Sequence, residues 1–316
     1  MIRRFRTTSL ALALVTVTAL AACGSSSSKA SNTTAAAASG SSTTAAAPST
    51  TAASGCSGPS DAYVKTIGNV SDFKPVKADT LTVVTSLPGP GFWEGSDTDP
   101  TKLKSGYEYD IAKDMETAFG LHHLVILNKE FDAIVAGQVT KSDYDVALSQ
   151  ISITCDRAKV VDFSVPYFQS NQGILVRAGT KVPDLAAAKA LHWGVQTSTT
   201  CVDLLNKIGA TNVQAFKDLP TGYTALQAGT VDAFCIDTAI NLGEAARSNG
   251  KLQVVAQFNQ PGGPDQYGAI IPKGSTNVGA INGALNQLIT SGQLSALAKK
   301  DLTADPGTIP VITIPS

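Results

Sequence analysis

The sequence predicts an α/β protein made of two successive units, each a largely parallel sheet flanked by helices. Two observations lead to this fold class. Short apolar or β-branched runs alternate with stretches of helical periodicity, and only a few residues separate them. The alternation stops at Ala178-Gly179 and then restarts, which indicates a second unit of the same kind.

The first unit begins with the β-branched run 81–85, a predicted strand that ends at a loop of two prolines and two glycines over 86–91. Ile111, Met115 and Phe119 recur at helical spacing, so we expect a helix over 106–119 that stops before Gly120. The other elements expected here are a helix over 131–139 and strands or buried apolar runs over 125–127, 146–148, 160–163 and 172–176.

Strands and helices alternate in the second unit as well. Ser198, Thr199 and Thr200 precede a helix that extends to Lys207, and one of the three is expected to cap its first turn. The predicted strands cover 192–195, 213–216, 231–236, 252–255 and 267–271. The other predicted helices open at Pro183-Asp184, cover 219–228, run up to Arg247, and cover 278–302 with a break at Ser291-Gly292.

The first 55 residues are expected to lie outside the folded body. Residues 1–22 have three arginines followed by an apolar core and small residues, which is typical of a secretory signal peptide. They end at Cys23 in a pattern that resembles the lipobox of bacterial lipoproteins, so we expect Cys23 to be acylated. The alternative is a plain cleaved signal with an incidental cysteine. Residues 23–55, rich in Ser, Thr and Ala, are predicted to be a flexible linker, which is also open to glycosylation.

Charge and composition exclude several functions. The chain has 24 Lys and Arg against 25 Asp and Glu, and removal of residues 1–22 takes away three arginines and no acid, so the mature net charge is about −4. No basic cluster remains, which argues against nucleic acid as a partner. No later segment approaches the roughly 18 apolar residues of a membrane helix, so membrane contact is expected through the lipid only. The three histidines do not have the spacing of metal ligands, and we expect neither a metal nor a cofactor.

Four cysteines remain after Cys23, and an even number in an exported chain predicts two disulfides. Three pairings are possible. We favour Cys201–Cys235, because both fall in the second unit near strand ends, which leaves Cys56–Cys155.

Both units place polar groups just beyond the carboxyl end of a strand, where open α/β sheets bind ligands. The first unit has the segment 149–157, which carries a single cation, Arg157. A guanidinium fork matches the two oxygens of a carboxylate. The second unit has Thr197–Thr200 at a predicted helix N-terminus, which favours anions, and Asp237, which suits an ammonium group. Together they form the complement of an α-amino acid; the alternative is that Arg157 is an ordinary solvated loop residue.

These residues resemble a known family, the polar-amino-acid solute-binding proteins of bacterial ABC importers (family 3, type II periplasmic-binding fold). The resemblance covers about residues 79–305. It rests on LTVVTSLPGPGFW, GYEYDIAKDM, FDAIVAGQ, GVQTSTT, LQAGTVDAFCIDTAI, QYGAIIPKGS and above all SITxxRxxxVDFSxPY, which begins at Ser152. The fold it implies is a two-lobed Venus flytrap with two crossover hinge segments. Lobe 1 would hold residues 79–175 and 268–316, and lobe 2 residues 176–267.

The resemblance also implies ligand contacts. Arg157 would clamp the α-carboxylate with help from Ser152 and Gln150, Thr200 and Thr199 would add a contact from lobe 2, and Asp237 would take the α-ammonium. The other contacts that the resemblance implies follow the first loop, and most positions where this chain departs from the family pattern lie in that loop.

Phe92 and Trp93 follow this loop and are read either as core residues or as a platform for the ligand. Many relatives have an acid and an aromatic residue where this chain has Ser86 and Gly89. Relatives often have a small residue or a hydroxyl where this chain has Gln150. We expect Trp93 and Glu94 to supply what the loop lacks, against the alternative that Glu94 is a surface residue.

The function implied by the resemblance is capture of a polar amino acid by hinge closure and its delivery to an ABC permease. The protein is expected to be a monomer, not an enzyme, and lipid-anchored at the outer face of the cytoplasmic membrane. Two alternatives use the same fold. One is a cyclohexadienyl-dehydratase-like enzyme, for which Asp237 and Glu94 are the candidate acids or bases. The other is a sensory amino-acid-binding protein. The bound amino acid stays open, although an acidic ligand would call for a second cation.

Overall fold

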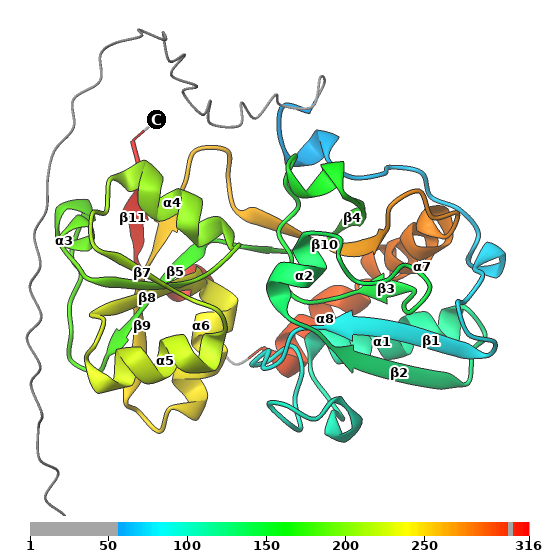
Figure 1. The fold of residues 1–316 in the computed structure, drawn as a ribbon, viewed down its shortest axis with the longest axis horizontal. Coiled ribbons are helices and arrows are strands. Elements are labelled where there is room, and N and C mark those ends of the chain that lie inside the picture. Colours follow the sequence, from blue (N-terminus) through cyan, green and yellow to red (C-terminus); the bar gives the residue numbers. More distant parts are fainter. Residues whose placement is uncertain (1–55, 303–305, 316) are drawn as a thin grey trace, which may run out of the picture. The chain divides into compact units, whose positions relative to one another are not determined.

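Two β-sheets, each with helices packed against it, make up this computed structural model, which describes residues 56–302 and 306–315 (Figure 1). The predicted signal peptide (1–22), the lipidation site Cys23 and the linker (to residue 55) lie outside these residues. Within the described segments, no helix combines the length and the apolar character needed to cross a membrane.

The first sheet has five strands in the order β2-β1-β3-β10-β4. Strand β1 pairs in parallel with β2 and with β3, whereas β10 runs antiparallel to both of its neighbours. The bounds are β1 Thr80–Thr85, β2 His123–Asn128, β3 Val146–Ala147, β4 Val161–Ser170 and β10 Asp265–Pro272.

Four helices accompany this sheet, and together they form the first lobe. Helix α1 begins after Gly106, whose φ of 119° suits glycine, and it buries Ile111 and Met115 as their spacing predicts. The predicted break at Ser291-Gly292 separates α7 from α8. The bounds are α1 Tyr107–Ala118, α2 Phe131–Val135, α7 Val278–Thr290 and α8 Gln293–Asp301.

The second sheet has six strands in the order β11-β9-β5-β8-β6-β7. Strand β6 is parallel to β7 and β8, and β11 is parallel to β9. Strand β5 is antiparallel to β8 and β9. The bounds are β5 Gln172–Arg177, β6 Trp193–Gln196, β7 Val213–Phe216, β8 Ala233–Asp237, β9 Leu252–Asn259 and β11 Val311–Thr313.

The helices of the second sheet complete the second lobe, and α5 has the predicted bounds. The carboxylate of Asp218 accepts a hydrogen bond from the Thr221 N–H at its start, and Gly229 closes it in the left-handed conformation. Their bounds are α3 Leu185–Lys189, α4 Thr200–Ile208, α5 Leu219–Ala228 and α6 Thr238–Arg247.

The prediction of largely parallel sheets is only partly right. Strands β5 and β10 run against their neighbours because each follows directly on a strand of the other sheet. Asn171 alone separates β4 from β5, and residues 260–264 separate β9 from β10. Strands β5 and β10 begin at the end of their sheet that faces the other lobe and run away from that lobe. Strands such as β1 and β8 run in the opposite direction and end facing the other lobe.

The lobe boundaries also differ from those expected. The chain changes sheet at Asn171, not after residue 175, and returns before Asp265, not at residue 268. Residues 268–316 do not all belong to the first lobe, because β11 pairs with β9 in the second sheet. Helix α8 packs on α1 and α7, so the chain passes between lobes a third time after α8. Both sheets belong to one compact unit.

Candidate ligand-binding site

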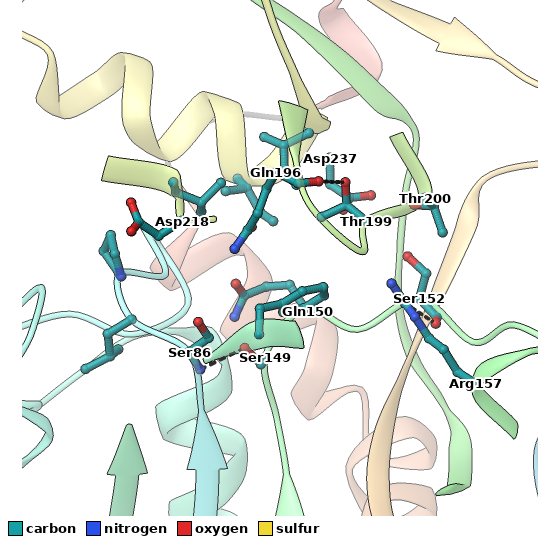
Figure 2. Close-up of a pocket in the computed structure, with 16 residues that line it drawn as sticks. Ser86, Ser149, Gln150, Ser152, Arg157, Gln196, Thr199, Thr200, Asp218 and Asp237 are labelled. Carbon is teal, nitrogen blue, oxygen red and sulfur yellow. Dashed lines mark hydrogen bonds between the residues drawn. The ribbon is translucent and has the colours of Figure 1, made fainter. Parts of the chain in front are cut away.

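A pocket lies where strand ends of the two lobes face each other, and both lobes contribute to its wall (Figure 2). Its residues follow β1 and β3 in the first lobe and β6, β7 and β8 in the second, the place predicted for ligand-binding groups. The polar lining residues are Ser86, Ser149, Gln150, Ser152, Arg157, Gln196, Thr199, Thr200, Asp218 and Asp237. The apolar ones are Leu87, Pro88, Phe131, Leu219, Ile236 and Ile240.

Arg157 is the one cation among these lining residues. Its Nη1 donates to the Ser152 carbonyl at 2.6 Å and its Nη2 to the Ser198 carbonyl, in the other lobe, at 2.8 Å. The guanidinium lies 5.6 Å from the centre of the Phe131 ring. No carboxylate of the described chain forms an ion pair with it. Backbone and ring contacts therefore orient the guanidinium without neutralising it.

Removal from water lowers the pKa of Arg157 to about 10, and the carboxylates of Asp265, Asp237 and Asp203 oppose this effect. At neutral pH the side chain is still protonated. It is thus a charged anion-binding group at a site that two lobes hold in place.

Asp265, the first residue of β10, lies at the centre of a hydrogen-bond network that the sequence did not reveal. Its Oδ2 accepts from Ser152 Oγ at 3.0 Å, Thr200 Oγ1 at 2.6 Å and Gln172 Nε2 at 2.7 Å, while its Oδ1 accepts from Gln260 at 2.7 Å. These donors come from both lobes and from a connection between them. Two of them, Ser152 and Thr200, are residues predicted to hold the ligand carboxylate.

Asp237 ends β8 and is buried beside this network. Gln172 Nε2 reaches its Oδ1 at 3.2 Å. Burial, and then the negative charge of Asp265, raise the pKa of Asp237 well above its usual value. No group of three or more His, Cys, Asp or Glu side chains in the described chain is arranged to hold a metal ion. A positive group placed beside this carboxyl would favour its ionised form.

Helix α4 begins at the pocket, as the run of hydroxyl residues predicts. Thr199 is its N-cap residue, but its hydroxyl donates back to the Gln196 carbonyl at 2.7 Å and does not cap the helix. Ser198 precedes it in the left-handed conformation, with φ of 60°. The expectation of a side-chain cap from this run is therefore wrong, because Thr199 bonds outside the helix and Thr200 bonds Asp265. The first N–H groups of α4 have no side-chain cap.

Glu108, on α1, is a second residue that sequence reasoning missed. It is fully buried, and its carboxylate accepts from Gln150 N at 2.8 Å, Trp93 Nε1 at 2.7 Å, the Tyr167 hydroxyl and Gln150 Nε2. Burial raises the pKa of Glu108, and the four donors act against that rise. Gln150 has a φ of 50°, so this carboxylate holds both its backbone and its side chain in an uncommon conformation.

Phe92 and Trp93 belong to the core and are not among the lining residues of the pocket, which favours the core reading of these two residues over the ligand platform. Phe92 is fully buried, with edge-to-face contacts to Tyr107 and Phe168. Trp93 donates to Glu108 behind the pocket. Glu94 accepts from the Gly91 N–H at 2.7 Å, so it shapes the loop and does not line the pocket either.

Gly89 and Gln150, two of the positions where this chain departs from the family pattern, are neighbours. A Cβ on Gly89 would lie 3.3 Å from both Nε2 and Oε1 of Gln150, and 3.0 Å from Trp93 Cδ1. The Gln150 amide therefore packs where a side chain at position 89 would begin.

Two disulfides connect the site segments to their surroundings, with the pairing favoured from the sequence. Cys56–Cys155 ties the start of the described chain to the turn that carries Arg157. Cys201–Cys235 joins the first turn of α4 to β8, two residues before Asp237. Each bridge thus restrains a segment that contributes to the pocket.

Known proteins with similar sequences are binding proteins. The chain is 29% identical over 236 residues to the glutamine-binding protein of an ABC transporter in Bacillus subtilis, which covers 73% of this chain and 81% of that protein. It is 28% identical over 209 residues to the L-cystine-binding protein of Escherichia coli, which covers 64% and 75%.

Solved structures show the same fold. An ancestral arginine-binding protein bound to glutamine matches with a TM-score of 0.62 and 28% identity, over 71% of this chain and 98% of that one. Residues 93–303 match the family model of bacterial extracellular solute-binding proteins, family 3. The two lobes, the cleft at their strand ends and this match over most of the chain agree, and the protein belongs to the bacterial extracellular solute-binding proteins of family 3.

Proposed function

We propose that this protein captures a polar amino acid between its lobes and delivers it to the permease of an ABC importer. The observation that carries the proposal is the pairing of opposite charges in one pocket. Arg157 offers an unneutralised guanidinium, and Asp237 offers a buried carboxyl with no cationic partner among the described residues. A zwitterion satisfies both. Two of the relatives are a glutamine-binding and an L-cystine-binding protein, which supports this ligand class.

In this proposal Arg157 binds the α-carboxylate together with the uncapped N–H groups at the start of α4. Ser152 and Thr200 donate to Asp265 in the structure, so a ligand carboxylate competes with Asp265 for their hydroxyls. Asp237 receives the α-ammonium. Because these groups come from both lobes, they act together only when the lobes are closed, and the ligand favours that state.

The enzyme reading has less support. Of its two candidate acids, only Asp237 lines the pocket, and Glu94 is bonded to its own loop.

We also propose that Cys23 carries the lipid that holds the protein, as a monomer, at the outer face of the membrane. Mass spectrometry of the mature N-terminus, with Cys23→Ala as the control, tests this anchor. Co-purification of the permease subunits tests import against sensing.

Calorimetry of the purified folded domain against a panel of amino acids tests the ligand class. We expect micromolar binding, about −8 kcal/mol, for at least one of them. Arg157→Ala should weaken it by 100-fold or more, because the carboxylate loses its only charged partner in the pocket. Lys159→Ala is the matched control, since Lys159 lies on the same turn, pairs with Asp156 and does not line the pocket. Near-normal binding by Arg157→Ala overturns the site assignment.

A further inference from the structure

The end of the pocket away from Arg157 carries several hydrogen-bond acceptors. Figure 2 shows Asp218 on one side of the pocket, Thr200 and Arg157 on the other, and the side chains of Gln150 and Gln196 between them. If the ligand α-carboxylate lies at Arg157, its side chain extends past the two amides toward Asp218. This step rests on the proposed function.

Both amides have their nitrogens engaged inside the protein. Gln150 Nε2 donates to buried Glu108, and Gln196 Nε2 donates to the Lys217 carbonyl at 3.3 Å. No donor of the described residues reaches Oε1 of either side chain. An amide whose nitrogen is held by an acceptor presents its oxygen to whatever lies on its other side. Each nitrogen uses one of its two N–H donors in these bonds, so the middle of the pocket offers two carbonyl oxygens and one further N–H from each amide.

Asp218 adds a negative charge. Its Oδ1 accepts the Thr221 N–H at 2.9 Å as the cap of α5, and its Oδ2 has no donor within the described chain. The neighbouring cation does not neutralise it, because Lys217 pairs with Glu130 at 3.5 Å. Capping alone would explain the presence of an aspartate here, but it uses one oxygen and leaves the other at the pocket wall.

Charge selects between possible ligands. The lining side chains contribute one positive group, Arg157, and two carboxyl groups, Asp237 and Asp218. The ligand α-carboxylate pairs with Arg157 and the α-ammonium with Asp237, and a cationic side chain pairs with the remaining charge of Asp218. An amide side chain leaves a negative charge unpaired, and an acidic side chain would put a second one beside Asp218. Desolvating an unpaired charge is costly, so the difference is selective.

We propose that this end of the pocket, formed by Gln150, Gln196 and Asp218, recognises a positively charged, donor-rich side chain, so that the ligand is a basic α-amino acid. Asp218 determines the selectivity through charge. Gln150, oriented by Glu108, supplies a fixed acceptor. A guanidinium or a terminal ammonium provides several N–H donors for these oxygens.

Calorimetry with arginine, lysine and ornithine against glutamine, asparagine and glutamate tests the proposal. We expect the wild-type protein to bind at least one basic amino acid 10-fold or more tightly than any of the other three. Asp218→Asn should reduce that affinity by 10-fold or more and should not weaken the affinity for glutamine, because no unpaired charge then faces an amide side chain. Asparagine also caps helices, so the fold is retained. Asp184→Asn is the matched control, because Asp184 caps α3 away from the pocket.

The outcomes separate this proposal from the one before it. If the wild-type protein prefers glutamine or glutamate, or if Asp218→Asn binds basic amino acids as tightly as the wild type, the selectivity proposal is overturned while capture of an amino acid by Arg157 still holds. If no amino acid binds, the proposed function is wrong and this proposal is wrong with it.

Discussion

Replacement of Glu108 by glutamine should destabilise the protein markedly, although the two side chains have nearly the same shape. Each carboxylate oxygen accepts two hydrogen bonds. Oε1 accepts from Gln150 N at 2.8 Å and from the Tyr167 hydroxyl, and Oε2 accepts from Trp93 Nε1 at 2.7 Å and from Gln150 Nε2. An amide nitrogen in place of one oxygen faces either Gln150 N or Trp93 Nε1, which can only donate, so that donor and the new N–H both lose their partner, whereas the Tyr167 hydroxyl or the Gln150 amide can turn to accept. Each buried donor left without a partner costs about 1–3 kcal/mol, so the loss is roughly 2–6 kcal/mol.

One effect opposes this loss. The neutral glutamine need not bury a charge, and burial already raises the pKa of Glu108. We therefore expect the lower half of the range, about 2–4 kcal/mol, out of the roughly 5–15 kcal/mol that holds a typical domain together. Release of Gln150 from its φ of 50° should also weaken ligand binding.

Urea denaturation at neutral pH, followed by circular dichroism, measures the free energy of unfolding. Glu94→Gln is the matched control, because Glu94 accepts a single hydrogen bond that an amide oxygen can still accept, and its cost should stay under about 0.5 kcal/mol. Adding Tyr167→Phe removes one of the four donors, so the double variant should lose less than the sum of the single losses. A Glu108→Gln variant within 0.5 kcal/mol of the wild type would refute the reasoning.

Two further predictions concern pH and packing. Burial and a neighbouring aspartate raise the pKa of Asp237. This carboxyl must ionise to pair with an ammonium group, so ligand binding below its pKa releases a proton. The ligand affinity therefore falls by up to tenfold per pH unit as the pH drops below that pKa. Calorimetry in buffers of different ionisation enthalpy counts the protons, and pH-independent affinity contradicts the prediction. Gly222→Ala places a Cβ 2.1 Å from Phe234 and should cost about 1–3 kcal/mol in urea denaturation; unchanged stability would show that this contact relaxes freely.

Local signals in the sequence are enough for most helices and strands of this protein. The bounds of α5 follow from Asp218, which caps its start, and Gly229, which ends it. Strand β11 escapes detection because its three residues are too few for a periodic pattern, and it exists through pairing with β9. The direction of β5 also depends on its partners, since nothing within Gln172–Arg177 indicates how that strand meets β8.

Some residues of the candidate site can likewise be found from local signals in the sequence, and others depend on distant partners. Arg157 and Asp237 stand out because a lone cation and a lone acid follow strands, and both line the pocket. Asp265 does not stand out, because its partners Ser152, Gln172 and Thr200 are 113, 93 and 65 residues away. Glu108 had a usable signal: it shares the helical spacing of Ile111 and Met115, and a charged residue on a buried helix face requires partners.

Gly89 and Gln150 look like independent departures from the family in the sequence, but in the structure they are one change. The Gln150 amide takes the space beside residue 89, and Glu108 fixes that amide from behind. A side chain at position 89 would press against it, so of the first loop Ser86, Leu87 and Pro88 line the pocket while residue 89 contributes little to side-chain recognition. In the selectivity proposed above, recognition rests on the oxygen of Gln150 and, across the pocket, on Asp218. The ligand of a relative with a bulky residue at position 89 is therefore a poor guide to the ligand of this protein.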